Sequence, residues 1–243
     1  MTDSLPAMVK IVKARTPARL LTGRSGGAYR TSTQLELRAA HAAARDAVRA
    51  DFNLQGHLGS EVIERFGIFE VTTEVGSKDE YLLRPDLGRR FSPRGRAMIS
   101  ERSPNEPDLQ ISIGDGLSTT AVAAQVPSLL PLVAQGASAR GWKLGQTFAI
   151  RFCRVGILNE IGDLVRPRVA LLLIGERPGL ATAESLSAYM ACRPRCGQSD
   201  ADRNLISNIH SRGVHIEEAA HRILNLADRM MRMELSGVRL REE

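Results

Sequence analysis

Hydrophobic residues in the second half of the chain form short, mainly apolar runs that are separated by longer segments of mixed polarity. The runs lie at residues 109–113 (LQISI), 148–153 (FAIRFC) and 168–174 (RVALLLI). Runs of this length are typical of strands buried on both faces, as in parallel sheets. The pattern therefore predicts an α/β fold over residues 105–243, with a Rossmann-like, mostly parallel sheet and helices on both faces.

Two helical stretches accompany these strands. Apolar residues recur every three or four positions from Val122 to Val133, which predicts a helical region. We expect it to be broken at Pro127 and Pro131, because proline lacks the backbone N–H that a helix interior needs. Residues 216–233 show the same period over a longer stretch and predict an amphipathic helix that closes the domain.

The N-terminal part of the chain follows a different pattern. Residues 16–31 are rich in Gly and Arg and indicate an extended arm. From residue 32 to about 49 the apolar positions fall on one helical face, with Ser32 or Thr33 available as the N-cap. His41 lies beside that face, so we expect it to be packed in the core.

A hairpin and a boundary complete the predicted organisation. Residues 68–74 (IFEVTTE) and 81–83 flank a polar turn and predict two paired strands. The polar segment 101–107 (ERSPNEP) then indicates a domain boundary. Residues 1–104 are thus expected to form an arm, helix and hairpin region that makes subunit contacts, and residues 105–243 the α/β domain.

Composition places the chain among globular proteins without a membrane span. Of its 243 residues, 43% are hydrophobic, 25% charged and 4% aromatic, which is enough apolar surface to bury a core. Each apolar run is far shorter than the roughly 20 residues that cross a bilayer. The N-terminus lacks the apolar core of a secretion signal, so we expect a cytoplasmic protein.

Charge and cysteine content suggest the kinds of partner. The formal net charge is +6, and an anionic partner would explain it. Because the basic residues are scattered and aromatic residues are few, we expect no nucleic acid; a phosphate-bearing cofactor or an acidic protein surface explains the charge as well. The spacing of Cys153, Cys192 and Cys196 matches no zinc pattern, which predicts reduced thiols and no metal site.

Glycine-containing loops follow the three predicted strands, at residues 114–116, 154–156 and 175–179. Ligands collect at the carboxyl ends of strands in open α/β sheets, and glycine lets a ligand approach the backbone. The competing interpretation is that these glycines only turn the chain. None of the loops matches a dinucleotide, P-loop or hydrolase motif. Asp115 and Ser118 could belong to a catalytic pair, but a helix N-cap at Ser118 is the simpler interpretation.

Two further motifs have structural and functional interpretations. Residues 208–213 (NIHSRG) nearly match the Asp-x-His-x-x-Gly motif of cobalamin proteins in which histidine ligates cobalt. Asn208 replaces the carboxylate that would raise the basicity of the imidazole, so we interpret His210 as a hydrogen-bonding loop residue. Residues 84–90 (RPDLGRR) could bind a phosphate or contact a subunit, or could form a solvated turn in which Asp86 pairs with an arginine.

Read together, a series of motifs resembles the small subunit of ethanolamine ammonia-lyase. The match runs in consistent order from about residue 16 to the C-terminus, and its motifs are long and unusual. They are TGRSGG at 22–27, RDAV at 45–48 in the helix that carries His41, YLLRPDLGRR at 81–90, DGLST at 115–119, IGERPGL at 174–180, ESLSAY at 184–189, DRNLISNIH at 202–210 and LSGV at 235–238.

The resemblance implies a subunit of an adenosylcobalamin-dependent enzyme that converts ethanolamine to acetaldehyde and ammonia. In this family the large subunit carries the substrate-binding and catalytic residues, so no catalytic residue is expected here. The small subunit helps to enclose the base-on cofactor where the two subunits meet. Carried over by position, its cofactor contacts fall on Val155, Glu176 and Leu205. Family members have cysteine at the position of Leu205, and an aspartate is common at that of Ala40.

Location and an alternative function complete the predictions. Some family members carry a long N-terminal extension associated with entry into a bacterial microcompartment, and this chain begins only a few residues before the matching region. The expected location is the cytoplasm, with housing in a microcompartment left open. The alternative is a free-standing, Rossmann-like enzyme that binds a nucleotide or phosphate and uses Asp115 and Glu176 directly.

Overall fold

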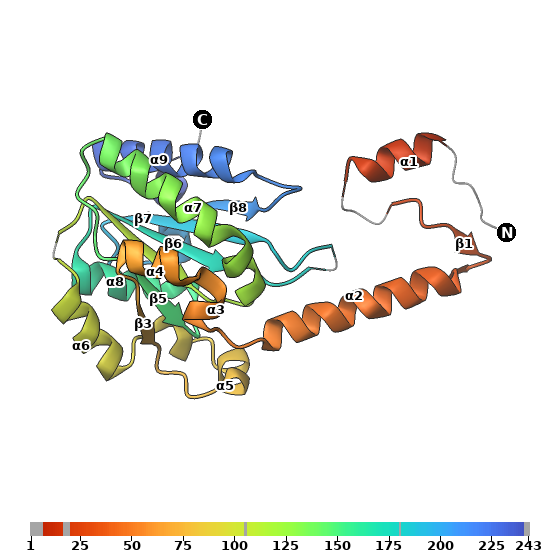
Figure 1. Cartoon of the computed structure of the whole chain (residues 1–243), viewed down its shortest axis with the longest axis horizontal. Helices are drawn as coiled ribbons and strands as arrows, with labels where there is room; N and C mark the ends of the chain where they lie inside the picture. The colour runs from red at the N-terminus through yellow and green to blue at the C-terminus, as the bar shows by residue number, and fades with distance from the viewer. Residues whose placement is uncertain (1–6, 17–19, 105, 180, 241–243) are drawn as a thin grey trace.

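A six-stranded sheet forms the centre of the molecule, with helices on both faces and a helical arm projecting from one side (Figure 1). The computed structural model describes residues 7–16, 20–104, 106–179 and 181–240. Parts of the predicted arm, of segment 101–107 and of the 174–180 motif lie outside these residues. In sheet order the strands are β3 (Phe69–Thr72), β5 (Phe148–Arg151), β4 (Leu109–Gly114), β6 (Val169–Gly175), β7 (Leu186–Cys192) and β8 (Asn204–Ile209).

The sheet is mixed, which confirms the α/β class but not the Rossmann-like topology. β3, β5, β4 and β6 run parallel. β7 and β8 are antiparallel to their neighbours, and the sequence pattern predicted neither of them. β8 is an edge strand in which only Ile206 and Ile209 are buried, so it lacks the continuous apolar run of a central strand.

Helices cover the two faces of the sheet unequally. One face packs against α7 (Thr119–Ala139) and α9 (Ile216–Met233), with α3 (Leu54–Leu58) and α4 (Ser60–Phe66) beside them. The other packs against α6 (Pro93–Arg102) and α8 (Leu158–Val165). This second hydrophobic core includes no fully buried residue of β7 or β8 among those the structure describes. On this face Ser187 and Ala191 of β7 are still buried, whereas Leu205 of β8 is 43% exposed, so the sheet is open at its β8 edge.

The helix α7 continues through both prolines, so the predicted break is wrong. Pro127 and Pro131 lie on its half-exposed side, where water can reach the carbonyl groups that lose their helical partners. Val126 and Leu130, the residues before the two prolines, face the core and are fully buried. Packing against the sheet and α9 stabilises the helix despite the two missing hydrogen bonds.

The predicted hairpin at residues 68–83 is also wrong. β3 pairs in parallel with β5, whereas Lys78–Leu83 form the helix α5, in which Ser77 accepts a cap hydrogen bond from the Glu80 amide. A small antiparallel pair lies elsewhere, between β1 (Arg24–Ser25) and β2 (Ala28–Tyr29). The division at residue 104 stays a prediction, and β3 before it hydrogen-bonds to β5 after it.

The arm consists of α1 (Ala7–Ala14), the β1–β2 pair and α2 (Thr31–Arg49). α2 begins one residue before the predicted cap and has no side-chain cap; Thr33 donates instead to the Thr22 carbonyl. His41 is exposed, so its predicted place in the core is wrong. The reason is tertiary: α2 projects away from the sheet (Figure 1). No helix within the described ranges has both the length and the apolarity to cross a membrane.

Candidate functional site

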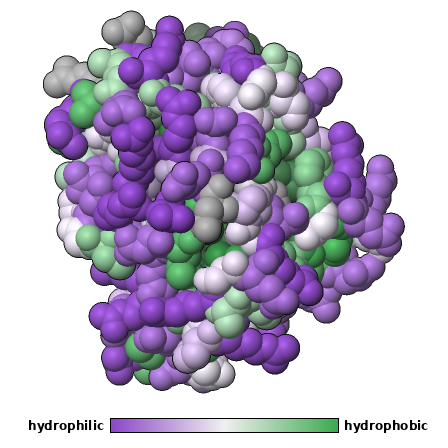
Figure 2. All heavy atoms as spheres, turned by 90° about the vertical axis from the view of Figure 1, so that its left-hand side faces the viewer, coloured by the Kyte–Doolittle hydropathy of each residue, from purple (hydrophilic) through white to green (hydrophobic). Residues whose placement is uncertain are grey.

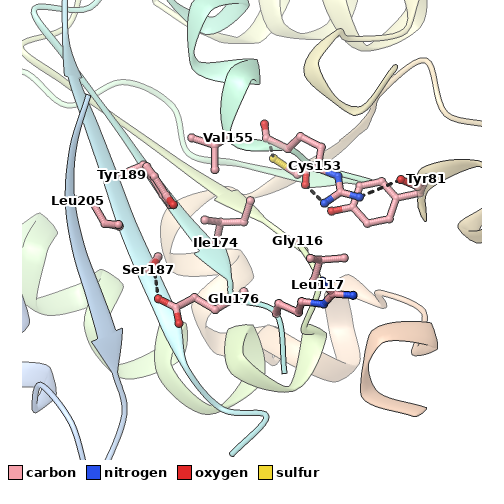
Figure 3. A pocket seen from close by; sticks show the side chains of 13 residues that line it. Tyr81, Gly116, Leu117, Cys153, Val155, Ile174, Glu176, Ser187, Tyr189 and Leu205 are labelled. Atoms are coloured by element: carbon pink, nitrogen blue, oxygen red, sulfur yellow. Dashed lines mark hydrogen bonds between the residues drawn. The ribbon is translucent and has the colours of Figure 1, made fainter. Parts of the chain in front are cut away.

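An open cavity of about 330 Å³ lies at the carboxyl ends of β4, β5 and β6. All three predicted loops contribute to it, and so do residues of β7 and β8. Val155, Glu176 and Leu205, which the sequence predicted as site residues, all line it (Figure 3). The full lining comprises Tyr81, Gly116, Leu117, Cys153, Arg154, Val155, Ile174, Gly175, Glu176, Arg177, Ser187, Tyr189 and Leu205.

Different elements position the three predicted residues. Val155 begins a short 3-10 turn four residues after the end of β5, and Glu176 follows the last residue of β6. Leu205 lies on the edge strand β8, opposite Tyr189 of β7, and is 43% exposed. Tyr189 is half-buried against the second core. The apolar part of the cavity therefore continues from Tyr189 to the exposed side chain of Leu205 at the β8 edge.

The Glu176 carboxylate joins the ends of three strands. One of its oxygens accepts from the Ser185 hydroxyl at 2.8 Å. The other oxygen accepts a short hydrogen bond from the Ser187 hydroxyl and a second hydrogen bond from the backbone N–H of Asn208 at 3.3 Å. A carboxylate offers about four acceptor positions, so roughly one is left for another donor. Glu176 thus shapes this edge and still presents an acceptor beside the cavity.

A cation stacked on an aromatic ring forms the opposite wall. The Arg154 guanidinium carbon lies 4.2 Å from the centre of the Tyr81 ring, and Nη2 donates to the Tyr81 carbonyl at 3.0 Å. The Tyr81 hydroxyl donates to the Cys153 carbonyl at 2.7 Å, and the ring is fully buried. Sequence reasoning missed this contact because it placed Tyr81 in a strand. The long match at residues 81–90 was the signal that the segment had a role.

Asp115 is a structural residue rather than a member of a catalytic pair. It is 1% exposed, and its two oxygens accept from the Phe152 and Cys153 amides, each at 2.8 Å. Phe152 adopts a left-handed conformation with φ 58°, which is uncommon for a bulky residue. Asp115 therefore anchors the turn that places Val155. Burial raises the pKa of the Asp115 carboxyl to about 6.

The remaining candidates form local structures. Ser118 accepts from the Ala121 amide at 3.1 Å, which confirms the predicted N-cap. His210 is buried and hydrogen-bonds to the Asn208 side chain at 2.8 Å, as its interpretation as a loop residue required. Arg84 donates twice to Asp86 in an exposed turn, which supports the interpretation of an ion-paired turn. The side-chain hydrogen bond from Arg84 lowers the pKa of Asp86.

Cys153 is the one cysteine among the described residues that line the cavity. Cys153, Cys192 and Cys196 are free, and burial raises the pKa of the Cys153 thiol. A protonated, buried thiol is a poor nucleophile. Within the described residues, no group of histidine, cysteine and carboxylate side chains could hold a metal ion.

Fold and cavity define the class: an α/β protein with a mixed sheet and an open cavity at the carboxyl ends of its parallel strands. A family model described as ethanolamine ammonia-lyase light chain (EutC) matches residues 7–241. The chain belongs to the ethanolamine ammonia-lyase light chain family.

Individual relatives agree with the family model. An ethanolamine ammonia-lyase small subunit from Clostridium perfringens is 43% identical over 230 residues, covering 95% of this chain and 76% of the relative. The small subunit from Clostridium acetobutylicum is 39% identical, and the match covers 95% of this chain and 93% of the relative. The small subunit from Clostridioides difficile is 41% identical, and the match covers 95% of this chain and 76% of the relative. The similarity therefore spans both the arm and the α/β body.

Proposed function

We propose that this chain is the small subunit of an adenosylcobalamin-dependent ethanolamine ammonia-lyase, which converts ethanolamine to acetaldehyde and ammonia. The observation that carries the proposal is the convergence of Val155, Glu176 and Leu205 on one cavity. These are the positions to which the family resemblance assigns cofactor contacts, and three separate segments of the chain supply them. A large subunit carries the catalytic residues in this proposal.

The cavity lining fits the nucleotide tail of the cofactor. Val155, Tyr189 and Leu205 offer apolar surface to a flat aromatic base. Glu176 offers its remaining acceptor position to a ribose hydroxyl. Arg154, which is stacked on the Tyr81 ring, adds a cation to the opposite wall of the cavity.

The size of the cavity supports a shared site. At about 330 Å³ it lies near the lower limit for small-molecule pockets. A tail can enter such a space, but a corrin ring cannot, so most of the cofactor must lie against another surface. The β8 edge, where Leu205 is 43% exposed, adjoins the cavity and supports contact with the large subunit there.

The residues of this chain bind and orient the ligand. When bound, the cofactor supplies the radical chemistry that protein side chains do not provide. Val155 and Leu205 exclude water from the tail, and Glu176 holds it by a hydrogen bond. The alternative of a free-standing enzyme that uses Asp115 and Glu176 lacks support, because Asp115 is buried and does not line the cavity. We place the complex in the cytoplasm and leave its housing in a microcompartment open.

The test is co-expression of this chain with a large subunit, followed by addition of cobalamin, gel filtration and a visible spectrum of the complex. We expect base-on corrin absorption to elute with both subunits, and ethanolamine deamination to require both. Each subunit alone serves as the control. A stable complex that retains no cobalamin would refute the cofactor role, and failure of the two chains to associate would refute the whole proposal.

A further inference from the structure

The net positive charge of the chain resides in one segment. Residues 7–49, hereafter the arm, contain nine Lys or Arg and two Asp or Glu, a net charge of +7. Residues 50–243 contain 24 basic and 24 acidic residues and are neutral. Basic residues are thus scattered along the whole chain, but the imbalance is confined to the arm. A binding surface for acidic groups is expected where the imbalance lies.

The arm also exposes apolar side chains. Six of the ten exposed large hydrophobic residues found among the described residues belong to it. They come from α1, from the segment that contains β1 and β2, and from α2: Met8, Ile11, Leu20, Leu21, Tyr29 and Leu35. By contrast, hydrophilic residues cover most of the side of the molecule that faces away from the arm (Figure 2). Clustered exposed apolar side chains mark interaction surfaces.

Arginines follow one side of α2. Arg38, Arg45 and Arg49 are spaced by seven and four residues, which puts them on the same helical face. Arg49 pairs with Asp79 of α5 at 3.0 Å. Arg38 and Arg45 are exposed and form no ion pair with any residue that the structure describes. The free part of this face therefore points to acidic groups on another molecule.

The end of the arm at Arg49, where α2 meets the α/β body, lies near the cavity. Asp79, the partner of Arg49, lies in the same short helix as Tyr81, whose ring lines the cavity. The arm projects on the side of the sheet toward which the central parallel strand β6 points (Figure 1). One partner that covers the cavity would therefore also meet the arm.

We propose that the arm docks on the large subunit, in a groove with an apolar floor and an acidic rim. This inference rests on the proposed function and adds a second, electrostatic contact to it. Nucleic acid fits less well, because Tyr29 is the only aromatic residue of the arm. A membrane surface fits less well, because the exposed apolar residues come from three elements instead of one face of a single helix.

The test compares two double charge reversals in the full chain. Arg38→Glu with Arg45→Glu changes the free arginine face, and Arg94→Glu with Arg239→Glu makes the same charge change at exposed positions of the neutral body. Binding to the large subunit is measured at about 50 mM and about 500 mM salt, since salt screens exposed charges. We expect the arm variant to bind roughly 10- to 100-fold more weakly at low salt, the difference to shrink at high salt, and the control to match the wild type.

Circular dichroism confirms that both variants fold, and anionic vesicles and duplex DNA serve as alternative partners. Equal binding of the arm and control variants to the large subunit would overturn the inference, as would a selective loss of binding to vesicles or DNA. If the wild-type chain itself fails to bind the large subunit, the proposed function fails. If the wild type binds and the arm variant binds equally well, only the role of the arm fails.

Discussion

Substitutions of Glu176 can distinguish its role in stabilising the fold from its role in binding the cofactor. Its carboxylate accepts from Ser185, Ser187 and Asn208, and one acceptor position remains for the cofactor. Glu176→Gln keeps one acceptor oxygen for Ser187 and Asn208, while its new amide group can donate to the Ser185 hydroxyl. The variant therefore keeps the hydrogen bonds with Ser185, Ser187 and Asn208, but it no longer offers a negatively charged acceptor to the ligand.

The two effects have different expected sizes. A hydrogen bond to a charged group contributes about 1.5–3 kcal/mol, which corresponds to roughly 10- to 100-fold in dissociation constant. We expect Glu176→Gln to weaken cobalamin binding by that factor and to lower the free energy of unfolding by less than about 1 kcal/mol. Glu176→Ala loses all three internal bonds. Because Ser187 is buried but Ser185 can reach water, we expect a loss of unfolding free energy of about 2–4 kcal/mol.

Urea unfolding of the chain and equilibrium dialysis of cobalamin against the two-subunit complex measure these quantities. Glu184→Gln is the matched control, since this exposed carboxylate lies in the same β6–β7 segment and its change alters charge equally. If Glu176→Gln binds cobalamin as tightly as the wild type while Glu176→Ala unfolds more easily, Glu176 is purely structural. The Glu176 carboxylate would then offer no acceptor position to the cofactor.

Three other substitutions test the remaining parts of the site. Because burial raises the pKa of Asp115 to about 6, the folded state holds more protons at this carboxyl than the unfolded state between about pH 4 and pH 6. The contribution of Asp115 to the free energy of unfolding therefore falls by about 3 kcal/mol as the pH rises through that window. Asp115→Asn should flatten this fall in urea unfolding at pH 4, 5 and 6; an unchanged slope would contradict it. Tyr81→Phe removes a buried hydroxyl donor to the Cys153 carbonyl and should lower the free energy of unfolding by about 1–2 kcal/mol in the same assay, whereas no change would mean that the bond contributes nothing. Leu205→Asp should reduce cobalamin retention by the complex at least about tenfold in equilibrium dialysis while changing chain stability by less than about 0.5 kcal/mol, since the side chain is 43% exposed; full retention would remove Leu205 from the site.

Local features of the fold followed from sequence wherever the relevant contacts lie close along the chain. The apolar runs predicted β4, β5 and β6, and the helical period predicted α9 with the bounds that the structure shows. Ser118 was predicted as an N-cap from a turn sequence alone. In each case the signal is a short-range period or a capping preference, so neighbouring residues suffice to reveal it.

Site residues were predicted from a different source. The three glycine-containing strand ends indicated a ligand edge, but the choice of Val155, Glu176 and Leu205 came from the family resemblance. The structure brings these residues to one cavity. The loop 154–156 was predicted, but the contact between Arg154 and Tyr81 was not, because it joins residues 73 positions apart and has no local pattern.

The sequence by itself thus determined the α/β class, the central strands, the last helix and the edge at which the cavity lies. Three features became visible only in the folded structure: α2 projects with His41 exposed, α7 continues through two prolines, and β7 and β8 run antiparallel with β8 as an open edge. These outcomes depend on which surfaces meet in the folded chain, and the free energy of such long-range packing overrides local propensity.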